Sequence, residues 1–220
     1  MQSCTDNLVY TGTDIEVVLT GNTYQAAFTE SSPVSTFNSG NQILLNASGS
    51  LQIDNRILTY MDNQWKAENE FSWSDLTGKT NVTAVYPVYP DLDYVQENLY
   101  KNNSLEDILY VKDEFPAGNS IHLQFKHLFS LLTLHLEGNL QTYFQKIEVT
   151  CPAVSSIIPK SAEIVLADNG THTTTIAQVS PSGNYSFIVP PVGNMVIAIN
   201  MVTNGKKYTT QLETKSFTAV

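Results

Sequence analysis

The fold is decided by the run Ile121-His-Leu-Gln-Phe125 and its continuation Lys126-His-Leu-Phe-Ser-Leu-Leu-Thr-Leu-His-Leu-Glu137. Apolar residues hold odd positions up to Phe125 and even positions from Leu128 onward, so the strand pattern slips by one residue near His127. A strand that stayed regular through this slip would expose its whole apolar set to water. Either a bulge or a bend that passes the chain from one sheet to another removes the problem, and both are typical of β-sandwiches.

The rest of the chain alternates strands with turns. Runs rich in β-branched and aromatic residues recur at roughly 8–12 residues, which favours a sandwich or barrel. We expect hairpin turns at Asp168-Asn-Gly170 and at Asn204-Gly205. The stretch from Tyr94 to Leu109 alone suits a helix, which its Asn and Ser residues limit to a short turn. The strand pattern restarts after Gly138, so the sequence predicts an all-β chain with a domain boundary there.

Composition excludes several classes of protein. The 220 residues are 42% hydrophobic and only 15% charged, a balance that favours a folded chain over a disordered one. A net charge of −10 repels phosphate backbones, so we expect no nucleic-acid partner. No run approaches the roughly 20 apolar residues that a membrane-spanning helix needs.

Motifs for catalysis or metal binding are missing from the sequence. The four histidines share no short metal-ligand spacing, and no nucleophile elbow or phosphate-binding loop occurs. Asp91-Leu-Asp93 offers at best part of a weak calcium site, because calcium needs six to eight oxygens. His127 is expected to bond backbone groups that the slip leaves unpaired, as a structural bend residue. We therefore expect no catalytic residue, no metal and no cofactor.

The two cysteines have different surroundings. Cys151 follows the alternating Ile147-x-Val149 and precedes Pro152, a place that suits an inert buried thiol. Cys4 follows the small residue Ser3, as the first residue of a mature bacterial lipoprotein does after its leader is cut away. We expect Cys4 to be the lipid attachment site, and the alternative is a stray thiol near the terminus.

Aromatic residues make up 10% of the chain. Most of these rings are expected to fill the core or to cap its end, because large aromatics dominate core burial. The alternative is a sugar-binding platform, for which Trp65 and Trp73 are the possible glycan contacts and nearby amides such as Asn63 would assist.

Several of these segments together resemble the fimbrillin-like proteins, the type V pilins of Gram-negative anaerobes. The resemblance is carried by Phe37-x-x-Gly40, Tyr60 to Trp65, Trp73, Tyr86-Pro87, Asp107-Ile-Leu-Tyr110 and Phe125-x-His127-Leu128. It implies two consecutive antiparallel β-sandwich domains of transthyretin-like or immunoglobulin-like type, which we place at residues 1–137 and 138–220. It also implies export as an outer-membrane lipoprotein, with residues 1–7 as a flexible tether, and assembly with other fimbrial subunits by strand exchange.

Two departures from the family shape the expected role. Polymerising members are cut by an arginine-specific protease after the first strand, whereas the single arginine, Arg56, lies inside an expected hairpin. The chain also stops soon after Ser216, so the second domain is expected to lack its last strand. We expect a non-enzymatic cell-surface adhesin or an accessory, tip or anchor subunit of a fimbrium. The alternative is a glycan-binding surface lipoprotein of a polysaccharide uptake system.

Overall fold

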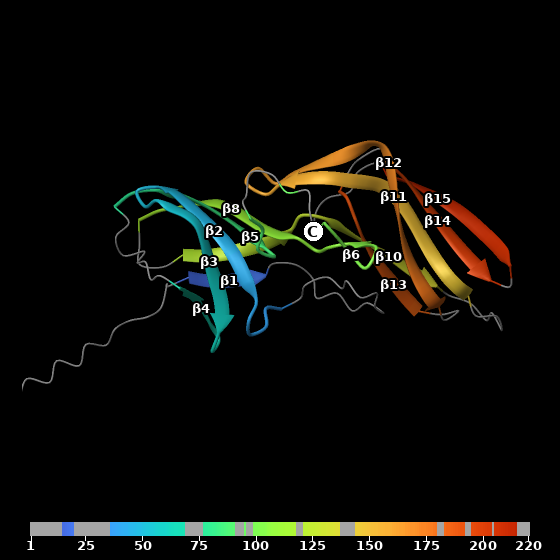
Figure 1. Cartoon of the computed structure of the whole chain (residues 1–220), viewed down its shortest axis with the longest axis horizontal. Helices are drawn as coiled ribbons and strands as arrows, with labels where there is room; N and C mark the ends of the chain where they lie inside the picture. Colours follow the sequence, from blue (N-terminus) through green and yellow to red (C-terminus); the bar gives the residue numbers. More distant parts are fainter. Residues whose placement is uncertain are drawn as a thin grey trace, which may run out of the picture.

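The computed structural model describes residues 15–19, 36–68, 77–90, 95, 99–117, 121–136, 144–179, 183–191, 195–203 and 205–214. Within these ranges the chain forms fifteen strands and no helix, which confirms the all-β class. Figure 1 shows an elongated molecule, with strands β1 to β5 at one end and β11 to β15 at the other. The strands form a seven-stranded sheet, a four-stranded sheet and two pairs.

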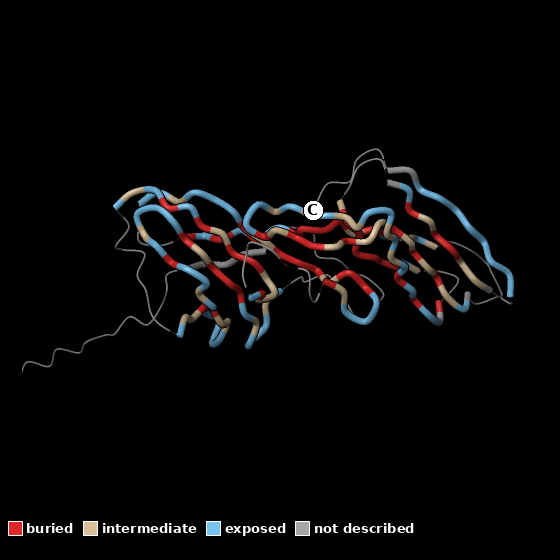
Figure 2. Tube along the Cα trace, turned by 45° about the horizontal axis from the view of Figure 1, so that its top comes forward, coloured by how far each residue is buried: buried red, intermediate tan, exposed pale blue. Residues whose placement is uncertain are grey.

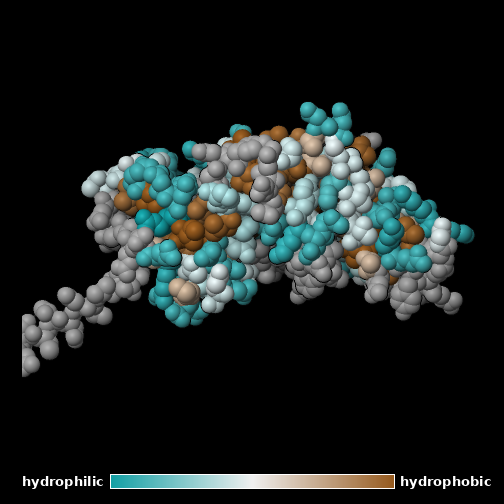
Figure 3. All heavy atoms as spheres, viewed as in Figure 1, coloured by the Kyte–Doolittle hydropathy of each residue, from teal (hydrophilic) through white to brown (hydrophobic). Residues whose placement is uncertain are grey.

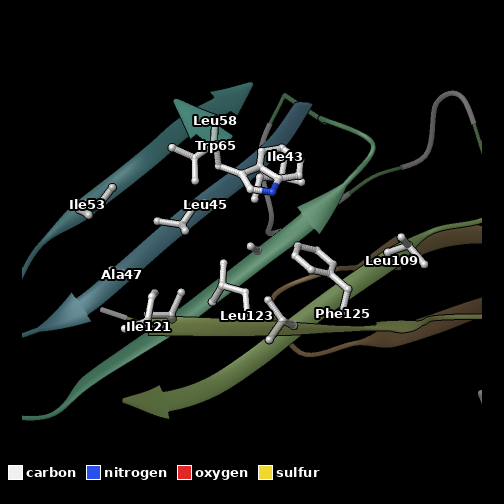
Figure 4. Close-up of a cluster of buried hydrophobic side chains, with 13 residues drawn as sticks. Ile43, Leu45, Ala47, Ile53, Leu58, Trp65, Leu109, Ile121, Leu123 and Phe125 are labelled. Atoms are coloured by element: carbon white, nitrogen blue, oxygen red, sulfur yellow. The ribbon is translucent and has the colours of Figure 1, made fainter. Parts of the chain in front are cut away.

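Seven strands make the N-terminal sheet, in the order β1-β9-β8-β5-β2-β3-β4. Their bounds are β1 (Ile15–Leu19), β2 (Gln42–Gly49), β3 (Ile53–Met61), β4 (Gln64–Ala67), β5 (Thr80–Tyr86), β8 (Leu109–Phe115) and β9 (Ile121–His127). Strand β9 pairs with β8 near the end of β9 alone, at Lys126 and His127, and its remaining part crosses the inner face of the sheet. Figure 4 shows side chains of β9 facing those of β2 and β3 across this core. The sheet therefore folds over its own hydrophobic core.

Strand β1 departs from the expected antiparallel pattern. It runs parallel to β9, with Ile15 opposite Ile121 and Leu19 opposite Phe125, and it lies near β4. All other described strand pairs are antiparallel. The antiparallel expectation came from tight turns, which fix direction only between strands adjacent in the chain. Because β1 and β9 are far apart in sequence, no turn decides their relative direction.

The C-terminal strands form two layers of unequal width. The wider layer has the order β12-β11-β14-β15, with bounds β11 (Phe144–Ile158), β12 (Glu163–Val179), β14 (Met195–Thr203) and β15 (Lys206–Thr214). Strands β10 (Ser130–Leu136) and β13 (Gly183–Val189) pair with each other and pack against it. Thr203 and Lys206 pair, so β14 and β15 form the hairpin that was expected around Asn204-Gly205, although Asn204 itself lies outside the described residues. Among the described strands, the layer of β10 and β13 therefore has two strands and the layer that it packs against has four.

The chain changes sheets at the slip in the sequence pattern. Strand β9 ends at His127 in the seven-stranded sheet, and β10 begins at Ser130 beside β13. The division into domains 1–137 and 138–220 stays a prediction. Because β10 pairs with a C-terminal strand, the topology favours Leu128–Phe129 as the place of any division.

Strand β12 corrects the turn expected at Asp168-Asn-Gly170. The strand runs on from Glu163 to Val179, and its register with β11 jumps from Leu166–Val154 to Thr171–Pro152. Residues 167–170 thus bulge out opposite Ala153, with Asn169 at a φ of 53°. The local turn signal produces a bulge here because β11 continues alongside on both sides of it. The bulge bends the β11–β12 ribbon.

A third core lies between the other two and joins the halves of the molecule. Val154 and Ile157 of β11 pack there with Leu44 and Val85 of the N-terminal sheet and with Phe129 from the break. Figure 2 shows buried segments along the middle of the molecule as well as at its two ends. In the segment expected to hold a helical turn, residues 100–105 form the small hairpin of β6 (Tyr100–Lys101) and β7 (Ser104–Leu105), while residues 94 and 96–98 lie outside the described residues.

Candidate functional site

The two motifs that carried the resemblance meet in the structure. Nδ1 of His127 lies 2.8 Å from Oδ1 and 2.9 Å from Oδ2 of Asp107, and both side chains are buried. Since the carboxylate only accepts hydrogen bonds, Nδ1 carries the proton and donates it. The backbone N–H of Leu128 also donates to the carbonyl of Ile108 at 2.7 Å. Together these bonds hold residues 107–108 against residues 127–128, where the chain changes sheets.

This pair adds a partner that the sequence did not predict. His127 was expected to bond backbone groups left unpaired by the slip, and in the structure it bonds a side chain 20 residues earlier in the chain. Asp107 stands in the other motif that carried the resemblance, but nothing in the spacing of the two motifs predicted that they touch. A carboxylate and an imidazole in the core act as a structural tie between strands.

Two tyrosines, Tyr86 and Tyr89, lie near the acidic residues beside this pair. Tyr89 is 4% exposed, and its hydroxyl has no hydrogen-bond partner among the described residues. Burial, helped by the charge of Glu106, raises the pKa of Tyr89 far above its usual value. Burial likewise raises the pKa of Tyr86 and of Glu106. Each group thus favours its uncharged form in this apolar setting.

A second tie joins the β6–β7 hairpin to the C-terminal sheet. The backbone N–H of Val154 donates to the Tyr100 hydroxyl at 2.7 Å, and Nε2 of His172 donates to the carbonyl of Asn103 at 2.8 Å. The rings of Tyr100 and His172 lie 4.1 Å apart between centroids. Sequence reasoning missed this contact, since its residues lie about 70 positions apart in the chain.

Trp65 lies in the core rather than on the surface. It is 4% exposed and lies within the buried cluster of Figure 4. Its ring meets Phe37 edge-on at 5.0 Å and Tyr60 at 5.2 Å between ring centroids. A buried ring offers no face to a sugar, so the structure removes Trp65 as a possible glycan contact. Trp73 lies outside the described residues.

The other candidate residues lie apart from one another. Cys4 is outside the described residues. Cys151 is buried in the C-terminal core, where burial raises the pKa of its thiol to about 11 and keeps it protonated at neutral pH. Within the described ranges, no three His, Cys, Asp or Glu side chains gather closely enough to hold a metal ion. The same part of the chain contains no helix able to cross a membrane.

The surface with the clearest potential for assembly is the inner face of β15. Tyr208 and Leu212 pair in register with Met201 and Ile197, so they share the face that carries the C-terminal core. They are nevertheless 51% and 38% exposed, and neither belongs to the buried C-terminal core. Figure 3 shows other hydrophobic patches over the N-terminal strands and the middle of the molecule.

Comparison with known proteins points to one family. The model of the fimbrillin-like family matches residues 23–219. The fold is similar to that of a candidate cell adhesion protein from Bacteroides ovatus, with a TM-score of 0.62 and 14% identity over 93% of this chain and 87% of that one. A candidate cell adhesion protein from Bacteroides uniformis gives 0.62 and 12% over 86% and 85%.

A fimbrial protein from Bacteroides ovatus also shares the fold. It gives a TM-score of 0.54 and 15% identity over 94% of this chain but 47% of its own length. At these identities the structures establish a shared fold. Among proteins with curated functions, none matches this sequence.

Proposed function

Because the chain belongs to the fimbrillin-like family, we propose that it is a non-enzymatic cell-surface subunit that assembles with other fimbrial subunits by β-strand exchange. The match covers residues 23–219 and therefore both groups of strands. Structural neighbours include a fimbrial protein and candidate adhesion proteins, which supports a surface role. We also propose that the chain takes an accessory, tip or anchor position in a fimbrium and carries a lipid on Cys4.

The observation that carries strand exchange is the unequal width of the two C-terminal layers. An incoming strand that extends the β10–β13 pair would lie over β15 and cover Tyr208 and Leu212. Its main chain would supply hydrogen bonds, and its alternate side chains would meet these two residues. Assembly of this kind is head-to-tail and does not close at a dimer.

The absence of catalysis is part of the same proposal. The buried Asp107–His127 pair ties two strand segments together, and the Cys151 thiol is protonated at neutral pH. Both potential reactive groups are thus explained by roles in the core.

The test uses the full chain on the cells that produce it. We expect fimbriae sheared from these cells to contain the chain, and Tyr208→Ser combined with Leu212→Ser to remove it from them. Val165→Ser is the matched control, because Val165 is 42% exposed on β12, away from this face. Retention of the double variant in fimbriae, or an intracellular location of the wild-type chain, would contradict the proposal.

A further inference from the structure

Strand β15 has an unusually regular free edge. It is outermost in its sheet among the described strands, and residues 205–212 are all exposed. Its nine pairs with β14, from Thr203–Lys206 to Met195–Thr214, show no register shift. The opposite edge of the sheet, β12, is interrupted by its bulge. Long, straight edges are templates for pairing with another strand, whereas bulged edges are protected from it.

The sequence of β15 is complementary to itself when two copies run antiparallel. With Thr210 opposite Thr210 of a second copy, Lys207 lies opposite Glu213, Tyr208 opposite Leu212, and Thr209 opposite Gln211. These are an opposite-charge pair, an aromatic–aliphatic pair and a polar pair, each of a favourable cross-strand type. We propose that β15 pairs with β15 of a second copy in this register and joins two four-stranded sheets into one sheet of eight.

The same register accounts for the exposed apolar residues of β15. Residues directly opposite each other share a face of the sheet, so Tyr208 of each copy lies beside Leu212 of the other on the inner face. The contact occurs twice, once on each side of the Thr210–Thr210 pair at the two-fold axis, and gives two apolar pairs on this face. Tyr208 and Leu212 are 51% and 38% exposed in the single chain, and each gains an apolar neighbour.

The charged residues of β15 favour antiparallel over parallel pairing of the two copies. Lys206 and Lys207 stand together at the start of β15, so parallel pairing would put them opposite lysines. Like charges directly opposite each other are destabilising. Only the antiparallel arrangement brings Lys207 opposite the acidic residue near the other end. Two-fold pairing also closes at the dimer, unlike strand exchange, so the two modes of assembly give different sizes.

Sedimentation velocity of the full chain tests the pairing through its charges. A nine-residue edge makes an interface at the small end of the range, so we expect a reversible dimer with a dissociation constant on the order of 10 to 100 µM. Lys207→Glu alone and Glu213→Lys alone each turn two attractive pairs into two repulsive ones, and each should weaken the dimer at least about tenfold. The double variant Lys207→Glu with Glu213→Lys should restore it.

The matched control for Lys207→Glu is the same substitution at the neighbouring lysine. Lys206→Glu changes the net charge as Lys207→Glu does, but residue 206 lies opposite the uncharged Thr214 in the proposed register, so it should weaken the dimer less. In the folded chain Lys207 and Glu213 pair with Val202 and Val196, so the swaps reverse no charge directly opposite within one copy. A wild-type chain that stays monomeric at about 500 µM, or a double variant as weak as either single one, overturns the proposal.

A cysteine at the two-fold axis tests the register directly. Only residue 210 lies opposite itself, at a Cα separation of about 4.5–5.5 Å that a disulfide can span. Thr210→Cys in a Cys4→Ser background should therefore give a covalent dimer on mild oxidation, and Tyr208→Cys in that background should give much less. Equal yields from the two variants would contradict this register.

Discussion

Removing Asp107 is expected to destabilise the whole molecule, because the carboxylate is the partner of a buried imidazole at the joint between sheets. Asp107 and His127 have side chains only 5% and 7% exposed, at 2.8 and 2.9 Å. A hydrogen bond to a charged group contributes about 1.5–3 kcal/mol, and a donor left buried without its partner costs about 1–3 kcal/mol more. Asp107→Ala should thus lower the free energy of unfolding by about 3–5 kcal/mol, the range measured when buried ion pairs lose one member.

Urea denaturation followed by fluorescence and circular dichroism measures this loss. The control is Glu114→Ala, which removes the partner of Lys79 from a pair whose side chains are 45% and 73% exposed. Water screens a surface pair of that kind, so the control should be nearly silent. In a double-mutant cycle, His127→Ala added to Asp107→Ala should cost far less than it does alone. A loss below about 1 kcal/mol for Asp107→Ala would refute the structural role of the pair.

Three further outcomes are expected. Tyr100→Phe removes the hydroxyl that accepts the Val154 N–H and should cost about 1–3 kcal/mol in the same denaturation assay, whereas Tyr208→Phe, at an exposed position, should be neutral. The pKa of the Cys151 thiol is raised by burial from 9.0 to about 11, so the unfolded chain loses this proton first and stability should fall as pH rises from about 9 to 11; Cys151→Ala should flatten that slope, and an unchanged slope would count against it. Expression of the precursor with an alkyne-labelled fatty acid should label the wild type and leave Cys4→Ser unlabelled, and equal labelling would exclude Cys4 as the lipid site.

Local patterns predicted the class of fold and the hairpin of β14 and β15. The slip near His127 indicated a bulge or a bend because side-chain alternation is a property of a few neighbouring residues. The turn at Asn204-Gly205 was likewise predicted from its own residues. Asn102 and Asn103 have φ values of 49° and 61°, so the Asn-Asn pair signalled a two-residue hairpin turn where we expected a helical turn.

Long-range contacts set the features that the sequence did not predict. Asp168-Asn-Gly170 has the composition of a hairpin turn, but the strand β11 beside it turns it into a bulge. The parallel pairing of β1 with β9 and the contact of Asp107 with His127 depend on chain segments that meet only in the folded molecule. Trp65 illustrates the same limit, because its residue type suits either a core or a sugar platform and only packing decides between them.

The bent ribbon of β11 and β12 also governs the order in which the chain can fold as it is made. The half of the ribbon next to the N-terminal sheet supplies Val154 and Ile157 to the middle core. Other members of that core, such as Leu44 and Val85, come from far earlier in the chain. A polypeptide that emerges from its N-terminus therefore carries an incomplete apolar surface until residues 154–166 follow. Until then the N-terminal strands leave part of this surface exposed to water. Slow arrival of the ribbon would therefore lengthen the time during which the early strands can aggregate.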